Sequence, residues 1–378
     1  MTSPARYYAD PTTASKYATE LLVKAGLSEK DAKSMADCLV LADVRGVDTH
    51  GLARLPQYLE RASNGRVNAK PNFKLFEKTL VVAHLDGDNG FGFVVATRAM
   101  ESAIKRAEIY GIGMVTVNHS NHFGMGATYV LQALEKNMIS LVFTNSAKQM
   151  PPFWGKETLL GISPFAAGAP SNNEIPYILD MAPSVVAKGK IRRAAHRGES
   201  IPVGWALDAD GNPTTDANVT LNGSMAPIGG PKGSGIAILM DVMSGVLTGA
   251  AFGGEVGDQY KDPRPQNVGH CFIAIKPDIF MTTDEFRARM DVLAQHVHGV
   301  TPAPGFNEVL FPGEPSIASV FSAAGKGFHM PRQKGRCLLM PQSSMVLLSF
   351  LCRRSLYLWS HKRYPIPPVR KDDQIVPM

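Results

Sequence analysis

The chain has few cysteines and no long apolar segment. Its 378 residues include only four cysteines, which stand far apart and form no CxxC pair: Cys38, Cys271, Cys337 and Cys352. A disulfide framework or a zinc site needs paired or closely spaced cysteines, so we expect reduced thiols. The first residues lack the basic and apolar regions of a secretory signal, and no run of about 18 uncharged apolar residues occurs. We therefore predict a cytoplasmic protein with no membrane partner.

The sequence also lacks a uniform charge excess. Its formal net charge is +6, but the residues from Ser316 onward hold ten Lys or Arg and two Asp or Glu, whereas the preceding 315 residues hold 29 basic and 31 acidic residues. The body is nearly neutral and contains neither zinc-finger spacing nor an aromatic RNA-binding signature. We predict no nucleic-acid partner. We interpret 316–378 as an atypical basic tail that comes from an altered reading frame or an alternative exon.

Two common nucleotide-binding motifs are absent. No predicted strand is followed by GxGxxG with an acidic residue about 20 positions later, which argues against a Rossmann dinucleotide site. GxxxxGK[ST] is missing too, since Lys232 is followed by glycine. The segment 229–235, GGPKGSG, nevertheless combines a cation, small residues and free amides before a predicted helix, which would suit a phosphate. A packing turn explains the same residues equally well.

Apolar periodicity predicts alternating helices and strands. Amphipathic patterns predict helices at 13–25, from Ser28 onward, and at 93–110, 127–137, 185–195 and 236–247. The Ser28 hydroxyl is expected to cap the second helix. Runs rich in β-branched residues predict strands at 78–85, 113–117, 138–144 and 175–182. This alternation favours an α/β architecture, and the chain length favours two or three domains.

Two histidine motifs carry the strongest chemical signal. Residues 48–56, DTHGLARLP, place a hydroxyl, an imidazole and a guanidinium together, and residues 119–124, HSNHFG, supply two further imidazoles. Histidine exchanges protons near neutral pH, and the planar guanidinium fits a carboxylate. A lone histidine is more often structural, but two glycine-bounded motifs favour acid/base chemistry on a small organic acid. His119 and His122 have no third ligand at metal-binding spacing, so we predict no metal.

Several motifs in order resemble the malate/L-lactate dehydrogenase family of nicotinamide-dependent oxidoreductases, which is distinct from the Rossmann-type enzymes. The resemblance covers about residues 10–315 and rests on these segments: 43–68, 119–124, 160–170, 179–191, 204–216, 229–235 and 302–315. It implies NAD or NADP as the cofactor, a small 2-hydroxy or 2-keto acid as the substrate, and a homodimer.

The resemblance also implies an α/β fold in which a non-Rossmann, mixed-sheet cofactor domain is inserted between segments of a helical, α+β substrate domain. The implied divisions are an N-terminal helical segment at 1–75, a substrate-side segment at 76–122 with 301–315, an NAD(P)-binding domain at 123–300, and the tail at 316–378.

Individual residues receive roles from the same resemblance. His50 and His122 are alternative acid/base groups, assisted by the Thr49 hydroxyl where the family commonly has serine, and the choice between the two histidines stays open. By its own chemistry, a bidentate charge-assisted pair, Arg54 is the candidate for binding the substrate carboxylate, with a salt bridge to Glu60 or another acid as the alternative. The implied cofactor-binding residues are Phe123, Gly124, Ser146, Asp180, Met181, Ala182, Lys232 and Gly233. For Asp180 the alternative is a cap on a helix at 182–184.

The sequence therefore predicts hydride transfer between nicotinamide and a malate- or lactate-like 2-hydroxy acid, with histidine acid/base catalysis. The alternative is a catalytically impaired relative that acts as a binding or scaffold protein, because the residues after Pro315 depart from the family pattern.

Overall fold

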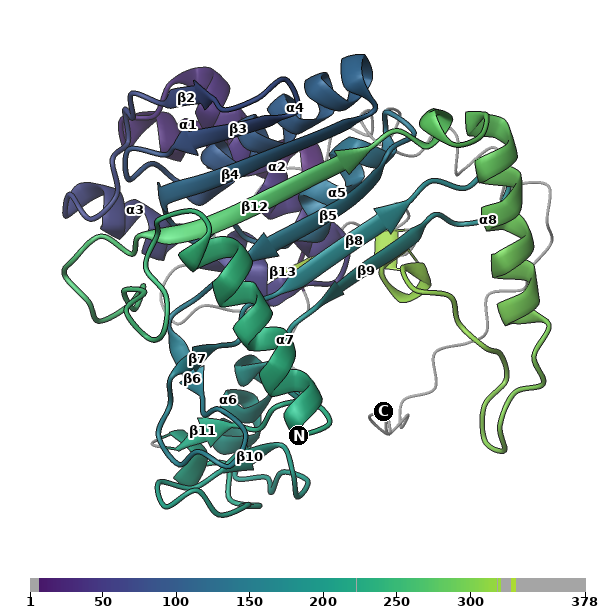
Figure 1. The fold of residues 1–378 in the computed structure, drawn as a ribbon. Helices are drawn as coiled ribbons and strands as arrows, with labels where there is room; N and C mark the ends of the chain where they lie inside the picture. Colours follow the sequence, from purple (N-terminus) through teal and green to yellow (C-terminus); the bar gives the residue numbers. More distant parts are fainter. Residues whose placement is uncertain (1–6, 222, 318, 321–327, 331–378) are drawn as a thin grey trace. The chain divides into compact units, whose positions relative to one another are not determined.

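A seven-stranded mixed sheet organises the part of the chain that the computed structural model describes, residues 7–221, 223–317, 319–320 and 328–330 (Figure 1). Only β3 and β4 are parallel neighbours, and every other pair in this sheet is antiparallel. The strands in sheet order are β2 (Lys74–Glu77), β3 (Val82–Asp86), β4 (Ile112–Ser120), β12 (Val268–Ile275), β5 (Ile139–Thr144), β8 (Phe165–Ala169) and β9 (Tyr177–Met181). The mixed sheet agrees with the expected fold class, while the domain divisions stay a prediction.

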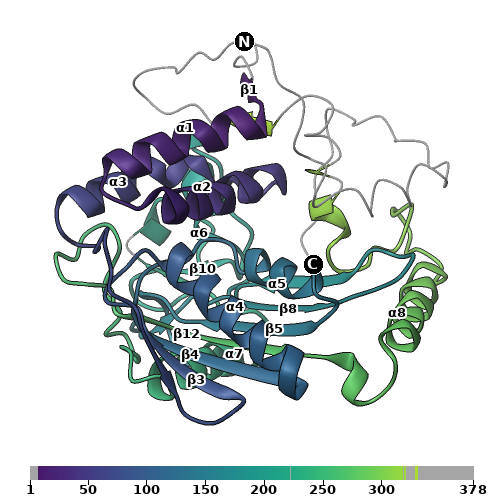
Figure 2. The ribbon, with the colours of Figure 1, turned by 90° about the horizontal axis from the view of Figure 1, so that it is seen from above.

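Alternating side chains of the central strand β12 build a core on each face of the sheet. Phe272 and Ala274 pack with α4 and α5, whereas Cys271 packs with Met240 of α7. Figure 2 shows α4 and α5 on one face and α7 on the other. Burial on both faces explains why this strand is almost entirely apolar. The helices concerned are α4 (Gly92–Tyr110), α5 (Ala127–Leu134) and α7 (Pro231–Asp241).

The N-terminal helices lie outside α4 and α5 (Figure 2). As expected, the Ser28 hydroxyl accepts a hydrogen bond from the Asp31 amide at 3.2 Å and caps the second helix. The first helix begins at Pro11 rather than Thr13, because the Asp10 carboxylate caps it and proline fits the first helical position. These helices are α1 (Pro11–Lys24), α2 (Glu29–Val44) and α3 (Leu55–Ser63).

The remaining elements form smaller units around the sheet. The expected helix at 236–247 starts earlier, at Pro231, and passes into a π-helical turn at Val242–Val246. The others are β1 (Tyr7–Ala9) paired with β13 (Phe328–Met330), β6 (Lys148–Met150) with β7 (Leu160–Gly161), β10 (Ala206–Leu207) with β11 (Ser224–Met225), α6 (Lys188–Arg197), α8 (Thr283–His298), and 3-10 turns at Asp48–His50, Leu52–Arg54, Val219–Leu221 and Pro277–Ile279.

Two expectations concern features beyond the sheet. Among the described residues no helix has the length and apolarity needed to cross a membrane. Cys38 and Cys271 are buried free thiols, whereas Cys337, Cys352 and the tail beyond residue 330 lie outside the described residues.

Candidate active site

The DTHG motif forms a tight connection between α2 and α3. Two successive 3-10 turns, Asp48–His50 and Leu52–Arg54, carry the chain from one helix to the next. Arg54 directly precedes α3, and Tyr58 follows one helical turn later on the same side. This connection therefore presents an imidazole, a guanidinium and a phenol within one short stretch.

The structure brings His50 and His122 together, although 72 positions separate them in the chain. Their ring centroids lie 5.5 Å apart with planes inclined by 20°. The Thr49 Oγ1 atom lies 2.9 Å from His50 Nδ1, so the hydroxyl orients that ring. Both histidines are half-buried. The two motifs thus contribute to one site.

Tyr58 and Gly124 orient His122. Tyr58 Oη lies 2.8 Å from His122 Nδ1. Burial holds the pKa of the Tyr58 phenol well above its usual range, so the phenol keeps its proton and can donate it to His122. The Gly124 amide also donates to His122 Nδ1, at 3.4 Å. Two donors at Nδ1 favour the neutral ring that carries its proton on Nε2.

Arg54 uses part of its guanidinium within the protein. Its Nε donates to the Thr49 carbonyl, and its Nη1 donates to Tyr260 Oη at 3.2 Å. Within the described residues Glu60, the partner weighed from the sequence, forms no ion pair with it. Nη2 forms no hydrogen bond in the described part of the chain and is left for a ligand.

Burial keeps both imidazoles neutral at ordinary pH. It lowers the pKa of His50 to about 3, and the nearby positive charge of Arg54 lowers it further in the same direction. Burial also holds the pKa of His122 well below its usual range, again with Arg54 contributing. Neutral imidazole is the form that can accept a proton.

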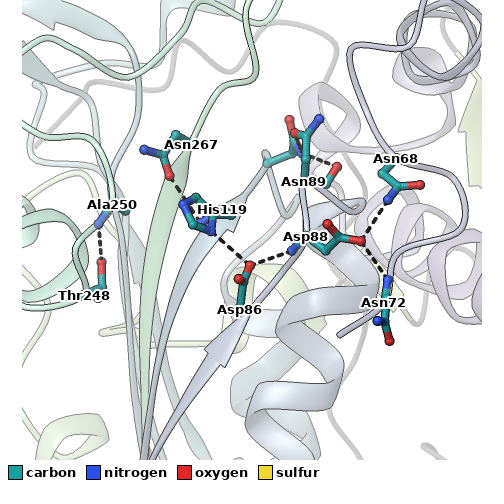
Figure 3. A network of polar contacts seen from close by, with 10 residues as sticks. Asn68, Asn72, Asp86, Asp88, Asn89, His119, Thr248, Ala250 and Asn267 are labelled. Carbon is teal, nitrogen blue, oxygen red and sulfur yellow. Dashed lines mark hydrogen bonds and ion pairs between the residues drawn. The ribbon is translucent and has the colours of Figure 1, made fainter. Parts of the chain in front are cut away.

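His119, the first histidine of the HSNHFG motif, points away from this pair. The register between β4 and β12 shifts between Val268 and His270, and such a bulge redirects side chains. His119 Nδ1 lies 3.0 Å from Asp86 Oδ1, and its backbone amide donates to Asn267 Oδ1 at 3.2 Å (Figure 3). The two histidines therefore do not share a ligand position.

A loop at 257–266, which the sequence did not single out, packs against the site. The Gln259 carbonyl accepts from Arg61 Nη1 at 2.9 Å, and Gln266 Oε1 accepts from the His122 amide at 3.2 Å. The spacing of Arg54, Tyr58 and Arg61 along a helix is a signal that could have revealed Tyr58 and Arg61. No comparable sequence signal marks Gln259 or Gln266.

Asp180 lies at the end of β9, beside the start of α5. Its Oδ2 accepts a hydrogen bond from the Ala127 amide at 2.8 Å, so it caps α5 and not a helix at 182–184. The residue as a whole is exposed, but its carboxyl lies against the protein, and this burial raises the pKa of the carboxyl to about 6. Met181 and Ala182 follow it and are half-buried.

The glycine turn at 229–235 packs directly against the chain that follows Ala182. A Cβ on Gly233 would lie 2.6 Å from the Pro183 carbonyl, so only glycine fits this contact. Lys232 is exposed at the start of α7. The structure thus places Lys232 and Gly233 in the same region as the Asp180–Ala182 segment.

The other implied cofactor residues differ in environment. Phe123 is buried and stacks on His270, with ring centroids 4.8 Å apart, so its side chain belongs to the core. Gly124 has φ +81° and packs against Phe93. The Ser146 Oγ atom is buried and has no hydrogen-bond partner in the described part of the chain.

The fold and site define an α/β protein with a paired-histidine centre and no Rossmann motif. The family model described as malate/L-lactate dehydrogenase matches residues 9–336, and the chain belongs to this family. The match extends beyond Pro315, where the motif comparison ended the resemblance. Beyond that point Val320 packs with α1 and α2 in a cluster that includes Ala14 and Val40. Packing of this kind uses ordinary apolar residues, which carry no recognisable motif.

Relatives with assigned activities cover most of the chain. L-sulfolactate dehydrogenase of Methanocaldococcus jannaschii is 40% identical over 304 residues, 80% of this chain and 88% of that protein. NAD(+) ureidoglycolate dehydrogenase of Escherichia coli K12 is 37% identical over 310 residues, 82% of this chain and 88% of that protein. The solved structure of the M. jannaschii sulfolactate dehydrogenase superposes with a TM-score of 0.81 and 38% identity, covering 87% of this chain and 94% of that one.

Proposed function

We propose that this chain is an NAD(P)-dependent dehydrogenase that transfers hydride between nicotinamide and a small 2-hydroxy acid. The observation that carries the proposal is the stacked pair His50 and His122 beside the incompletely used guanidinium of Arg54. Acid/base groups next to a carboxylate-binding arginine suit oxidation of a hydroxyl group adjacent to a carboxylate. The names of the relatives denote 2-hydroxy acid substrates, and they include both an NAD(+) and an NADP(+) enzyme.

The two histidines receive different roles from their hydrogen bonds. His50 can donate its Nδ1 proton to Thr49 Oγ1, which leaves the Nε2 lone pair free to accept the substrate hydroxyl proton. His122 accepts at Nδ1 and carries its proton on Nε2, so it donates a hydrogen bond to the same substrate oxygen. Arg54 Nη2 binds the carboxylate. This arrangement holds the substrate oxygen between a proton acceptor and a hydrogen-bond donor.

Residues around β9 and the glycine turn fit a dinucleotide. Asp180 is exposed as a residue, the Ser146 hydroxyl lacks a protein partner among the described residues, and Lys232 offers a cation next to the buried Gly233. These groups would hold the sugar and phosphate parts, with Met181 and Ala182 alongside and the backbone at Phe123 and Gly124 near the reacting end. The bound nicotinamide would accept or supply the hydride.

An exposed apolar face supports the expected homodimer. Along α7 and the following π-helical turn these side chains remain about half exposed: Ile238 47%, Leu239 47%, Val242 44%, Val246 55% and Leu247 53%. A continuous apolar stripe of this kind is typical of an association surface. We expect light scattering of the purified chain to give the mass of a dimer, and a monomer at all concentrations would contradict this part of the proposal.

Nicotinamide absorbance with a panel of 2-hydroxy and 2-keto acids, each with NAD and NADP, tests the function. We expect turnover by the parent chain, and a loss of kcat of about 100- to 10,000-fold in His50→Ala, the proton acceptor. His122→Ala should lose kcat and bind the acid less tightly. His119→Asn is the matched control, because that imidazole contacts Asp86 and Asn favours the same left-handed backbone.

The outcomes separate the alternatives. Cofactor binding without turnover of any acid would favour the catalytically impaired relative. A fully active His50→Ala together with an inactive His122→Ala would exchange the two roles. Loss of activity in His119→Asn alone would move the site to the Asp86 side of the sheet.

A further inference from the structure

Asp43, on the last turn of α2, links that helix to the catalytic connection. Its Oδ2 accepts a hydrogen bond from the Leu52 amide at 2.7 Å, and only 7% of the residue is exposed. Leu52 is the first residue of the second 3-10 turn, two residues after His50 and two before Arg54. The single hydrogen bond therefore connects a rigid helix to the midpoint of the segment that carries both functional side chains.

Gly51 packs directly on the same carboxylate. A Cβ at this position would lie 1.9 Å from Asp43 Oδ1 and 2.4 Å from Oδ2. The backbone itself imposes no need for glycine, because Gly51 has φ −93° and ψ −157°, which any residue adopts. Contact with the Asp43 carboxylate is thus what excludes a side chain at position 51.

The hydrogen bonds of the Asp43 carboxylate are incomplete among the described residues. Its Oδ1 atom is buried and has no hydrogen-bond partner in the described part of the chain. Leaving such an atom unpaired in the interior costs free energy, and an apolar side chain would avoid that cost. An aspartate at this position is therefore not explained by stabilisation of α2. It is explained by the hydrogen bond that its carboxylate accepts from the Leu52 amide.

We propose that Asp43 is a positioning residue for this site: its carboxylate, pressed against Gly51 and bonded to Leu52, sets where His50 and Arg54 stand relative to His122. The inference deepens the proposed dehydrogenase function and rests on it. Displacement of reacting groups by about 1 Å can lower a rate on the order of 100-fold, so one lost hydrogen bond would affect proton transfer and carboxylate binding together.

Four variants test this role. Asp43→Ala removes the acceptor and should lower kcat about 10- to 100-fold and raise KM for the acid, with NADH affinity measured by fluorescence unchanged. Asp43→Asn keeps an acceptor oxygen for Leu52 and should retain most of the activity. Gly51→Ala should be at least as damaging as Asp43→Ala. Asp37→Ala is the matched control on α2, since the Asp37 carboxylate pairs with Lys33 and accepts a hydrogen bond from Ser15 of α1 instead of contacting the connection to α3.

The double variant Asp43→Ala/Gly51→Ala gives the sharpest result. Removing the carboxylate makes room for the new methyl group, so the double variant should be no worse than Asp43→Ala alone, a strongly non-additive outcome. Additive losses would overturn the contact on which the inference depends. An Asp43→Asn enzyme as impaired as Asp43→Ala would overturn the acceptor role.

A second measurement does not depend on turnover. Amide hydrogen exchange of residues 46–55 should accelerate in Asp43→Ala but not in Asp43→Asn, because only the first variant releases the Leu52 amide. If the parent chain turned over no acid, the proposed function would be refuted. The exchange measurement would still test whether Asp43 holds the Leu52 amide. Unchanged exchange in Asp43→Ala would refute it.

Discussion

Tyr58→Phe isolates the contribution of the phenol that contacts His122. The change removes one oxygen atom, and the ring keeps its edge contacts with Phe91 at 6.5 Å and Phe93 at 5.2 Å. The fold should therefore persist. The interaction that disappears is the 2.8 Å contact with His122 Nδ1.

The expected size follows from the environment of His122. Leaving a buried hydrogen-bonding atom without its partner costs about 1–3 kcal/mol. If this cost raises the energy of the transition state, kcat/KM falls tenfold for each roughly 1.4 kcal/mol. The expected loss in kcat/KM is then about 5- to 150-fold. The loss should appear mainly in kcat, because the phenol fixes the ring that contacts the reacting oxygen and does not itself bind the carboxylate.

Steady-state kinetics with the best acid from the panel measure the effect, and urea unfolding shows whether the fold is intact. Tyr110→Phe is the matched control, since Tyr110 is exposed at the end of α4, away from the histidines. A Tyr58→Phe enzyme whose kcat and KM both equal those of the parent would refute the proposal that Tyr58 orients His122. So would a loss that unfolding data explain entirely.

Two further predictions concern the glycine turn and Asp43. Gly233→Ala should weaken binding of NADH, measured by fluorescence titration, because its methyl group would press on the Pro183 carbonyl at 2.6 Å; Gly235→Ala, with nothing within 4 Å, should bind normally and stabilise α7 by about 0.5–1 kcal/mol. Equal affinities in the two variants would remove this turn from the cofactor site. Burial raises the pKa of the Asp43 carboxyl to about 7, above its unfolded value of about 4, so folding takes up a proton and the free energy of unfolding falls as pH rises between these values. In urea unfolding, the free energy of unfolding of Asp43→Asn minus that of the parent should therefore be larger at about pH 8 than at about pH 5. A difference that does not change with pH would contradict the raised pKa.

Local signals in the sequence determined several elements correctly. The Ser28 cap starts α2, and α4 ends at Tyr110 because Gly111 adopts the left-handed conformation at φ +83°. Capping and helix termination depend on residues within one turn, so the sequence is sufficient to predict them. The same holds for the two histidine motifs, whose residue types indicate their chemistry without any fold.

The contacts between distant segments of the chain could be established only from the tertiary structure. β12, the strand that pairs with both β4 and β5 at the centre of the sheet, was not predicted from the sequence. A strand buried on both faces has no alternating pattern, and its apolar run gives no indication of its partners. Its first residue, Val268, pairs with Ser120 at the end of β4, two residues before His122.

Other contacts between residues far apart in the chain were also not predicted from the sequence, because local patterns do not indicate long-range partners. Asp180 caps α5, which lies 53 positions earlier in the chain, and Gln266 binds the His122 amide from 144 positions away. Tyr58 reaches His122 across 64 positions. The sequence alone determined which side chains could do acid/base work and where helices begin and end. Distances between remote segments arise from packing of the whole chain, so the pairing of the two histidines and the contacts that Tyr58 and Asp43 make became visible only in the folded protein.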